Sequence, residues 1–327
     1  MSLESDSIVD RRRLRRKLTF WRVLAVLIAV GAVLAVWARY GQPKLSFADT
    51  ASPYIARIKI QGLIRNDDER TESLDRLARS NVKAVVVHID SPGGTTAGSE
   101  QLHDALRRVA AAKPTVVVVD GLAASGAYIA AMASDQIFAQ GTSLVGSIGV
   151  LFQYPNLTGL LDSVGVKVEA IRSSPLKAAP NGFEPTSPEA RAAIEALVRD
   201  TYDWFKALVR DRRHMDEATL TRVSDGRVFT GRQAIELKLV DQLGNEKSAI
   251  DWLARERGVD SKLGVRDWKL KPRFSDLSFL HLAALGVLDV VGLGSLAERL
   301  EGSAALRAID LLNLDGLLAL WHPPITQ

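Results

Sequence analysis

The 327-residue chain contains no cysteine, only five histidines and few aromatic residues, which make up 6% of the sequence. The absence of cysteine excludes disulfide bonds and a thiol nucleophile. Five histidines leave few candidates for a histidine base. We expect neither a metal ion nor an organic cofactor.

The chain also lacks a basic surface of the kind that binds nucleic acid, although its formal net charge is +4. Removing the eight basic and three acidic residues of positions 1–40 from the totals of 42 and 38 leaves 34 and 35. The body of the protein is therefore neutral. Because phosphate binding needs clustered lysine and arginine, we expect no nucleic-acid partner.

The N-terminus combines a basic run with an apolar run. Six basic residues lie within residues 11–17, and residues 20–38 are apolar except for Arg22, with Trp21 and Trp37 near the two ends. About twenty residues at helical rise cross a bilayer core of roughly 30 Å. The positive-inside rule then predicts a cytoplasmic segment 1–19, a single transmembrane anchor over 20–38 and an extracytoplasmic remainder, periplasmic in a bacterial inner membrane. A cleaved signal peptide is the alternative.

After a polar linker over 41–53, apolar runs alternate with a helical pattern, which predicts an α/β fold. Near-continuous apolar runs are typical of strands in a parallel sheet that is covered on both faces. A serine, a proline and an acidic residue at 187–189 predict the start of a long helix. The predicted strands are 54–60, 82–89, 114–119 and 166–171, and the predicted helices are 97–112, one from 187 onward and 230–238.

Three glycine-rich or serine-bearing loops follow apolar strands: Asp90–Gly94, Asp120–Tyr128 and Val145–Val150. Such loops line the ligand crevice of open parallel sheets. Ser125 stands among small residues where one loop turns into a helix, and the N–H of Gly126 can stabilise an oxyanion there. Ser125 is thus a candidate nucleophile. The alternative is that it only caps the following helix.

A serine nucleophile needs a base, and the residues alone leave the choice open. His88 is the only histidine near a candidate loop, although its place in a predicted strand favours a core histidine. Lys177 lies in a loop with small and apolar neighbours, whereas Lys167 starts a predicted strand. To act as a base, a lysine needs its pKa lowered from about 10.4 towards 7, which burial can achieve. An ordinary exposed lysine is the alternative.

Five motifs resemble, in order, those of the bacterial signal peptide peptidases of the short, single-copy type. The resemblance covers residues 54–260 and implies a Clp-protease/crotonase-like fold, a serine endopeptidase activity and a Ser–Lys dyad. The peptidase domain is then expected over 54–272. The motifs are Asp90–Gly94, Ala123–Tyr128, Gly146–Val150, Gly226–Ala234 and Leu239–Gly244.

The resemblance also implies roles for single residues. Ser125 is implied as the nucleophile, Lys177 as the base, and Ser147 as the residue that holds the lysine by a hydrogen bond. The oxyanion hole is implied to consist of Gly126 and the Gly93–Gly94 loop. The segment before Lys177 lacks the glycine and the aromatic residue that the family pattern has there.

Substrates and assembly follow from the same resemblance. It implies hydrophobic peptides, such as signal-peptide remnants in the membrane, as substrates. It also implies a homo-oligomeric ring in which serine and lysine come from neighbouring chains. The alternatives are a stomatin-directed Ser–Lys membrane peptidase, a crotonase-like acyl-CoA enzyme and an inactive scaffold. The predicted anchor and the Ser125/Lys177 pair argue against the acyl-CoA enzyme.

The C-terminal extension, residues 273–327, is rich in leucine. Charged residues interrupt it too often for a membrane-spanning helix. We therefore predict amphipathic helices that lie on the membrane or pack between subunits.

Overall fold

The computed structural model describes Trp21, residues 52–270 and residues 317–321. Within these residues, no helix has both the length and the apolar character needed to cross a bilayer. The predicted span 20–38 lies outside the described residues except for Trp21, as do the cytoplasmic segment 1–19 and most of the linker and the C-terminal extension.

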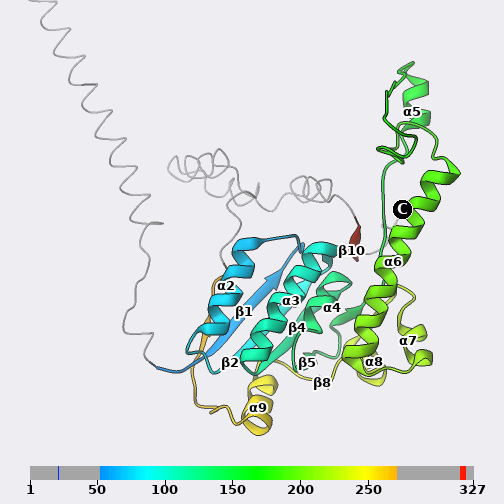
Figure 1. Cartoon of the computed structure of the whole chain (residues 1–327). Helices are drawn as coiled ribbons and strands as arrows, with labels where there is room; N and C mark the ends of the chain where they lie inside the picture. The colour runs from blue at the N-terminus through cyan, green and yellow to red at the C-terminus, as the bar shows by residue number, and fades with distance from the viewer. Residues whose placement is uncertain (1–20, 22–51, 271–316, 322–327) are drawn as a thin grey trace, which may run out of the picture. The chain divides into compact units, whose positions relative to one another are not determined.

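An eight-stranded, mostly parallel sheet forms the centre of the described chain (Figure 1). Its main path runs β7-β6-β4-β2-β1-β9, while β5 pairs with β4 and β8 pairs with β5. Every pair is parallel except β6 with β7. The strands are β1 (Ile55–Gln61), β2 (Ala84–Ser91), β4 (Thr115–Ala124), β5 (Gln136–Ala139), β6 (Leu144–Gly146), β7 (Val228–Thr230), β8 (Gln242–Leu243) and β9 (Val265–Asp267).

Helices cover both faces of this sheet, because alternate side chains of each strand point to opposite faces. On one face, residues such as Val87 and Val117 pack with α2 (Asp68–Arg79), α3 (Thr96–Ala112) and α4 (Gly126–Ala131). On the other, residues including Val86 pack with α9 (Glu246–Arg257). The remaining helices are α5 (Thr158–Ser163), α6 (Pro188–Arg213), α7 (Glu217–Val223) and α8 (Gly231–Glu236).

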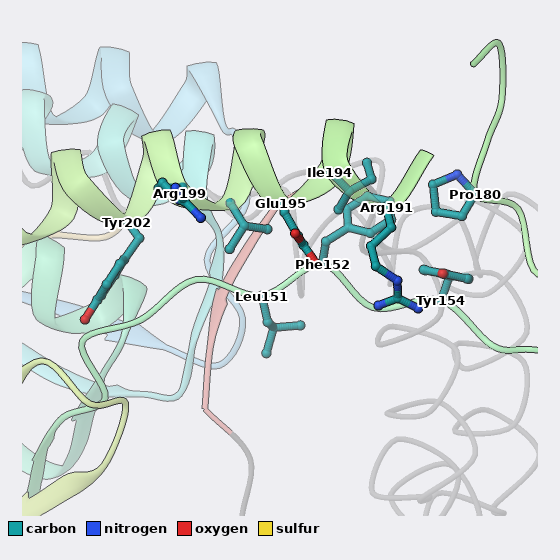
Figure 2. A pocket seen from close by; sticks show the side chains of 10 residues that line it. Leu151, Phe152, Tyr154, Pro180, Arg191, Ile194, Glu195, Arg199 and Tyr202 are labelled. Atoms are coloured by element: carbon teal, nitrogen blue, oxygen red, sulfur yellow. The ribbon is translucent and has the colours of Figure 1, made fainter. Parts of the chain in front are cut away.

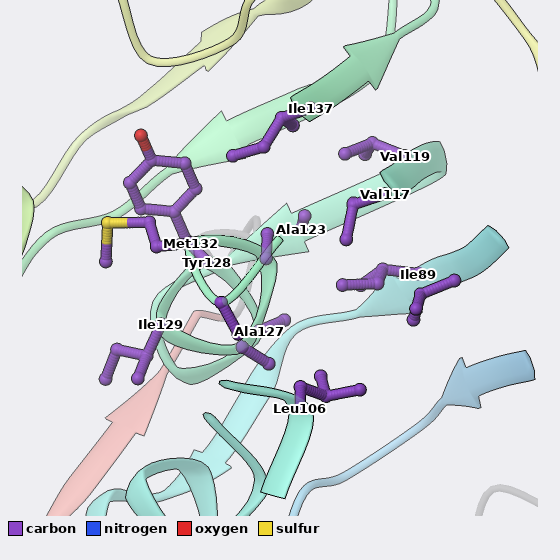
Figure 3. Close-up of a cluster of buried hydrophobic side chains, with 14 of the residues drawn as sticks. Ile89, Leu106, Val117, Val119, Ala123, Ala127, Tyr128, Ile129, Met132 and Ile137 are labelled. Carbon is purple, nitrogen blue, oxygen red and sulfur yellow. The ribbon is translucent and has the colours of Figure 1, made fainter. Parts of the chain in front are cut away.

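The larger core cluster includes Ala123 and Ala127, which lie two residues before and after Ser125 in the sequence (Figure 3). Ala127 and Tyr128 of α4 share this cluster with Leu106 of α3 and the strand residues Ile89 and Val119, and the Tyr128 ring lies beside Met132. The Tyr128 hydroxyl donates a 2.8 Å hydrogen bond to the Leu239 carbonyl. Complete burial raises the pKa of the Tyr128 phenol, so this donor remains protonated. The start of α4 is thereby fixed to the rest of the fold.

Most predicted elements are confirmed to within a few residues, and α6 begins as predicted, with the Ser187 Oγ accepting from the Ala190 N–H. The predicted strand 166–171 is wrong. Val166 and Val168 are about half exposed, at 47% and 54%, and the segment pairs with no strand among the described residues. A strand needs a neighbour for its backbone groups, and the described part of the chain offers none to this segment.

The segment 166–171 belongs to an arm formed by residues 152–187, which includes α5 and leads into α6 (Figure 1). Few contacts hold the arm together. They include the Tyr154 hydroxyl with Thr186 Oγ1 at 2.7 Å and the Leu157 N–H with the Gly182 carbonyl at 2.8 Å.

The described end of the C-terminal extension is a strand, which corrects the prediction of an amphipathic helix there. The short strand β10 (Leu318–Leu320) pairs antiparallel with β3 (Gly93–Thr95), with Ala319 opposite Gly94. Backbone pairing with β3 outweighs the helical pattern of the leucines. The rest of the extension, 273–316 and 322–327, lies outside the described residues.

Candidate active site

Ser125 lies at the sharp junction between β4 and α4, in a conformation that few serines adopt. Its φ is +55° and its ψ −116°, and its N–H donates to the Gly146 carbonyl at 2.7 Å. Its side chain makes no capping bond to α4, so the alternative of a simple helix cap is wrong. Strain at a non-glycine residue of this kind costs about 1–3 kcal/mol and is found mostly at functional sites.

The Ser125 hydroxyl makes no strong hydrogen bond to the described residues, so its oxygen is available as a nucleophile. The side chain is buried, and its one hydrogen bond reaches the Gly149 carbonyl at 3.5 Å, the limit for such a contact.

The two amides of the Gly93–Gly94 loop point in different directions, with the Gly93 N–H directed to Ser91 and the Gly94 N–H directed to β10. The Gly93 N–H donates to Ser91 Oγ at 3.1 Å, and Ser91 Oγ in turn donates to Gly62. On one side of β3, the Ile64 N–H donates to the Gly93 carbonyl, and the Ile64 carbonyl accepts from the Thr95 N–H. By the alternation of strand hydrogen bonds, the N–H of Gly94 faces the opposite side, where β10 lies.

Close packing explains why glycines stand beside the serine. A methyl group on Gly126 would come 2.1 Å from Ser99 Oγ and 2.9 Å from the Ala319 carbonyl oxygen. A methyl group on Gly93, whose φ is +98°, would come 2.7 Å from the Gly126 nitrogen. The backbones of these loops therefore meet so closely that neither Gly93 nor Gly126 has room for a side chain. The structure brings Ser125, Gly93, Gly94 and Gly126 together.

Ser147 follows Gly146, the residue that accepts the bond from the Ser125 N–H. Its φ is +53°, it is buried, and its N–H donates to the Arg227 carbonyl at 2.8 Å. Ser147 is thus next to the nucleophile loop. Within the described residues, no hydrogen bond joins its hydroxyl to Lys177.

Lys177 lies in the arm, and the structure does not bring it to Ser125 within one chain. The residue is exposed, and its N–H donates to the Ser174 carbonyl at 3.1 Å. In the described part of the chain, no hydrogen bond or ion pair links its ammonium to Ser125 or Ser147. The rival Lys167 is also exposed and in the same arm.

His88 has a structural role and is not placed to serve as the base. It shares a strand face with Val86, which packs on α9, while Ser125 and α4 lie at the other face. Its Nδ1 lies 2.8 Å from Asp120 Oδ1, and its Nε2 lies 2.8 Å from Glu246 Oε2. Both ring nitrogens are therefore engaged, and the Ser–His alternative is wrong.

A mostly apolar groove, about 520 Å³ in volume, lies between residues 151–154 and α6 (Figure 2), and the charged residues Arg191, Glu195 and Arg199 also line it. Leu151, Phe152 and Tyr154 line one side, with Ile194 and Val198 among the residues opposite. The sequence motifs did not predict this groove, although the alternation of Phe152 with Tyr154 was an available signal. In the described part of the chain, no group of three or more metal-ligating side chains comes together.

The strained serine, the glycine amides around it and the parallel sheet define a serine hydrolase. The sequence matches two protein families that agree with this class. The model of peptidase family S49 matches residues 107–260, and that of the Clp proteases matches residues 66–141. The second match, with the observed sheet, makes the fold α/β and Clp-protease/crotonase-like.

Individual relatives support the same peptidase family. A protein of Synechocystis sp. that is named as a protease is 34% identical over 216 residues, which cover 65% of this chain and 78% of that protein. A protein of Enterococcus faecium named as a signal peptide peptidase is 34% identical over 54% of this chain and 52% of its own length. The chloroplast serine protease SPPA of Arabidopsis thaliana is 32% identical over 51% of this chain and 25% of that protein.

The chain belongs to peptidase family S49 and is a serine protease of the signal peptide peptidase type. Among solved structures, a ClpP1 variant from Listeria monocytogenes aligns with a TM-score of 0.40 at 15% identity, covering 59% of this chain and 92% of that one. That similarity is too low to add to the argument.

Proposed function

We propose that this chain is a membrane-anchored endopeptidase that cleaves hydrophobic peptides, such as signal-peptide remnants, with a Ser125–Lys177 dyad. The strained Ser125 at the β4–α4 junction is the observation that carries this proposal. The amides of Gly94 and Gly126 beside it suit a tetrahedral oxyanion.

The proposed mechanism follows from these groups. Ser125 Oγ attacks the scissile carbonyl carbon and passes its proton to the neutral amine of Lys177, while the glycine N–H groups stabilise the oxyanion. The leaving amine takes that proton as the peptide bond breaks and an ester forms on Ser125. Water then hydrolyses the ester with the same base. Ser147 is proposed to hold the lysine amine in place.

A neighbouring chain is proposed to supply Lys177, in a homo-oligomeric ring. The arm that carries Lys177 and the start of α6 expose many large apolar side chains, a pattern typical of protein–protein interfaces. Burial of this surface by a second chain would also desolvate the lysine and favour its neutral form. The exposed residues are Leu160, Val164, Val166, Val168, Ile171, Leu176, Phe183 and Leu197.

The apolar groove supports hydrophobic peptides as the substrate class. Leu151, Phe152 and Val198 offer aliphatic and aromatic surface to side chains of a bound peptide. A membrane anchor over 20–38, with the catalytic domain on the extracytoplasmic side, would keep the groove beside the bilayer in which such remnants lie.

Active-site labelling tests the proposal. A fluorophosphonate probe should label the wild type, which should also cleave a leucine-rich peptide faster than a charged one. Ser125→Ala should lose both the labelling and the hydrolysis, because the ester can no longer form. Ser261→Ala, a change at an exposed serine that follows α9 and lies outside the arm, is the control and should behave as wild type. Equal labelling of Ser125→Ala and wild type would refute Ser125 as the nucleophile.

A further inference from the structure

Residues 317–321 of the chain form an extended strand that lies between β3 and Leu151 and makes backbone hydrogen bonds on both sides. On the β3 side, the Thr96 N–H donates to the Leu317 carbonyl at 3.0 Å and the Trp321 N–H donates to the Pro92 carbonyl at 2.8 Å. On the other side, Leu318 exchanges two 3.0 Å bonds with the backbone of Leu151. An added strand held by its main chain is a general mode of peptide recognition.

The register of this strand places one particular carbonyl at the serine. Leu317 and Trp321 bond to Thr96 and Pro92, the residues that flank β3, so the residue pair between them whose backbone groups face each other is Ala319 with Gly94. A methyl group on Gly93 would come 2.1 Å from the Ala319 carbonyl oxygen, and one on Gly126 would come 2.9 Å from it. The Ala319 oxygen thus occupies the space between the glycines that are proposed to bind the oxyanion.

Side-chain burial agrees with this register. Ala319 is completely buried and belongs to the larger core cluster, whereas Leu320 is only partly buried. A small side chain therefore fills the position next to the reacting carbonyl, and the residue after it turns away from the core.

We infer that residues 317–321 are an internal substrate, and that Ala319–Leu320 is the peptide bond presented to Ser125; this inference rests on the function proposed above. Ser125 Oγ forms an ester with the Ala319 carbonyl carbon as the bond to the Leu320 nitrogen breaks. The serine proton passes through the base to that nitrogen. The fragment that begins at Leu320 leaves as the free amine, and water then hydrolyses the ester to release a chain that ends at Ala319. Until release, the segment competes with other peptides.

Mass spectrometry of the purified full chain in detergent tests this inference. The wild type should convert with time to a species that ends at Ala319, while Ser125→Ala stays intact. Ala319→Phe should slow this cleavage by about tenfold or more, because the site around Ala319 holds only a methyl group. Leu320→Phe is the matched control, since the same ring is added at a partly exposed position, and it should be processed as wild type.

Hydrolysis of an added leucine-rich peptide, measured on the same samples, separates this inference from the proposed function. With Ala319→Phe, the rate on that peptide should be at least that of wild type, because its competitor is weakened. A wild type that cleaves the added peptide but never itself, or cuts itself at another bond, overturns the inference and leaves the proposed function standing. Equal self-cleavage in both phenylalanine variants also overturns it. A wild type that cleaves neither overturns both.

Discussion

Ser125 and the glycines around it form a site whose geometry depends on backbone positions more than on side chains. Gly94 is the most confined of them, since a methyl group there would come 1.8 Å from the Ile64 carbonyl oxygen. Ile64 bonds to β3 on both sides of Gly94, so its displacement would move the amide proposed to bind the oxyanion.

Gly94→Ala should therefore lower the free energy of unfolding by about 2–3 kcal/mol and nearly abolish peptide hydrolysis. Gly62→Ala is the control: Gly62 has a φ of +67° and no atom within 4 Å of the added methyl, so only a conformational cost of about 1 kcal/mol is expected. Urea unfolding and peptide hydrolysis measure the two effects. Equal activities in the two variants would contradict the account of Gly94.

The sequence predicted these residues, but it did not predict their hydrogen bonds or their backbone conformations. The motifs and the resemblance to the signal peptide peptidases pointed to Ser125, Ser147 and the glycines. Nothing in the local sequence reveals that the Gly93 N–H is already bound to Ser91, or that Ser125 is held at positive φ. Such facts arise from contacts between loops of different strands.

At the scale of elements, a polar cluster ties α9 to the sheet. Glu246, near the start of α9, accepts hydrogen bonds from Arg57 of β1 at 2.5 and 2.6 Å and contacts His88 of β2. The hydrogen bonds from Arg57 are the main cause that lowers the pKa of the Glu246 carboxyl, and His88 adds to it. A carboxylate with a lowered pKa stabilises the fold above its unfolded pKa of about 4.3.

Glu246→Gln should lower the free energy of unfolding at pH 7 by about 1–2 kcal/mol, since the charge-assisted bonds are weakened but the carboxylate is partly exposed. The difference from wild type should shrink as the pH falls through the pKa of the folded protein, where wild-type Glu246 is itself protonated. Glu72→Gln, at an exposed residue 3.8 Å from Arg76, should change little at any pH. Denaturant unfolding at pH 7 and pH 3 checks this. A difference of the same size at both pH values would argue against the ionic contribution.

Elements with strong local signals were predictable, and those that depend on distant partners were not. Apolar runs predicted β1, β2 and β4, and a capping serine with proline predicted α6. The apolar run at 166–171 predicted a strand, but this segment pairs with no strand within residues 52–270 and 317–321. The leucines near 318 suggested a helix, yet they form a strand because β3, over 200 residues earlier, offers backbone partners.

At the scale of the molecule, a single chain keeps Ser125 and Lys177 apart. Ser125 is buried in the body of the fold, while Lys177 is exposed on an arm with apolar side chains that no described segment covers. Assembly is proposed to complete the dyad and cover this surface at the same time. A single chain would then be inactive without any inhibitor.

Complementation between two inactive variants tests this central claim most directly. Ser125→Ala and Lys177→Ala are each expected to have no activity, because each removes half of one proton-transfer unit. When their subunits are mixed and allowed to exchange, some interfaces pair an intact Ser125 with an intact Lys177, so part of the wild-type peptide hydrolysis should return. Mixed oligomers that are shown to form yet remain inactive would contradict a dyad shared between chains.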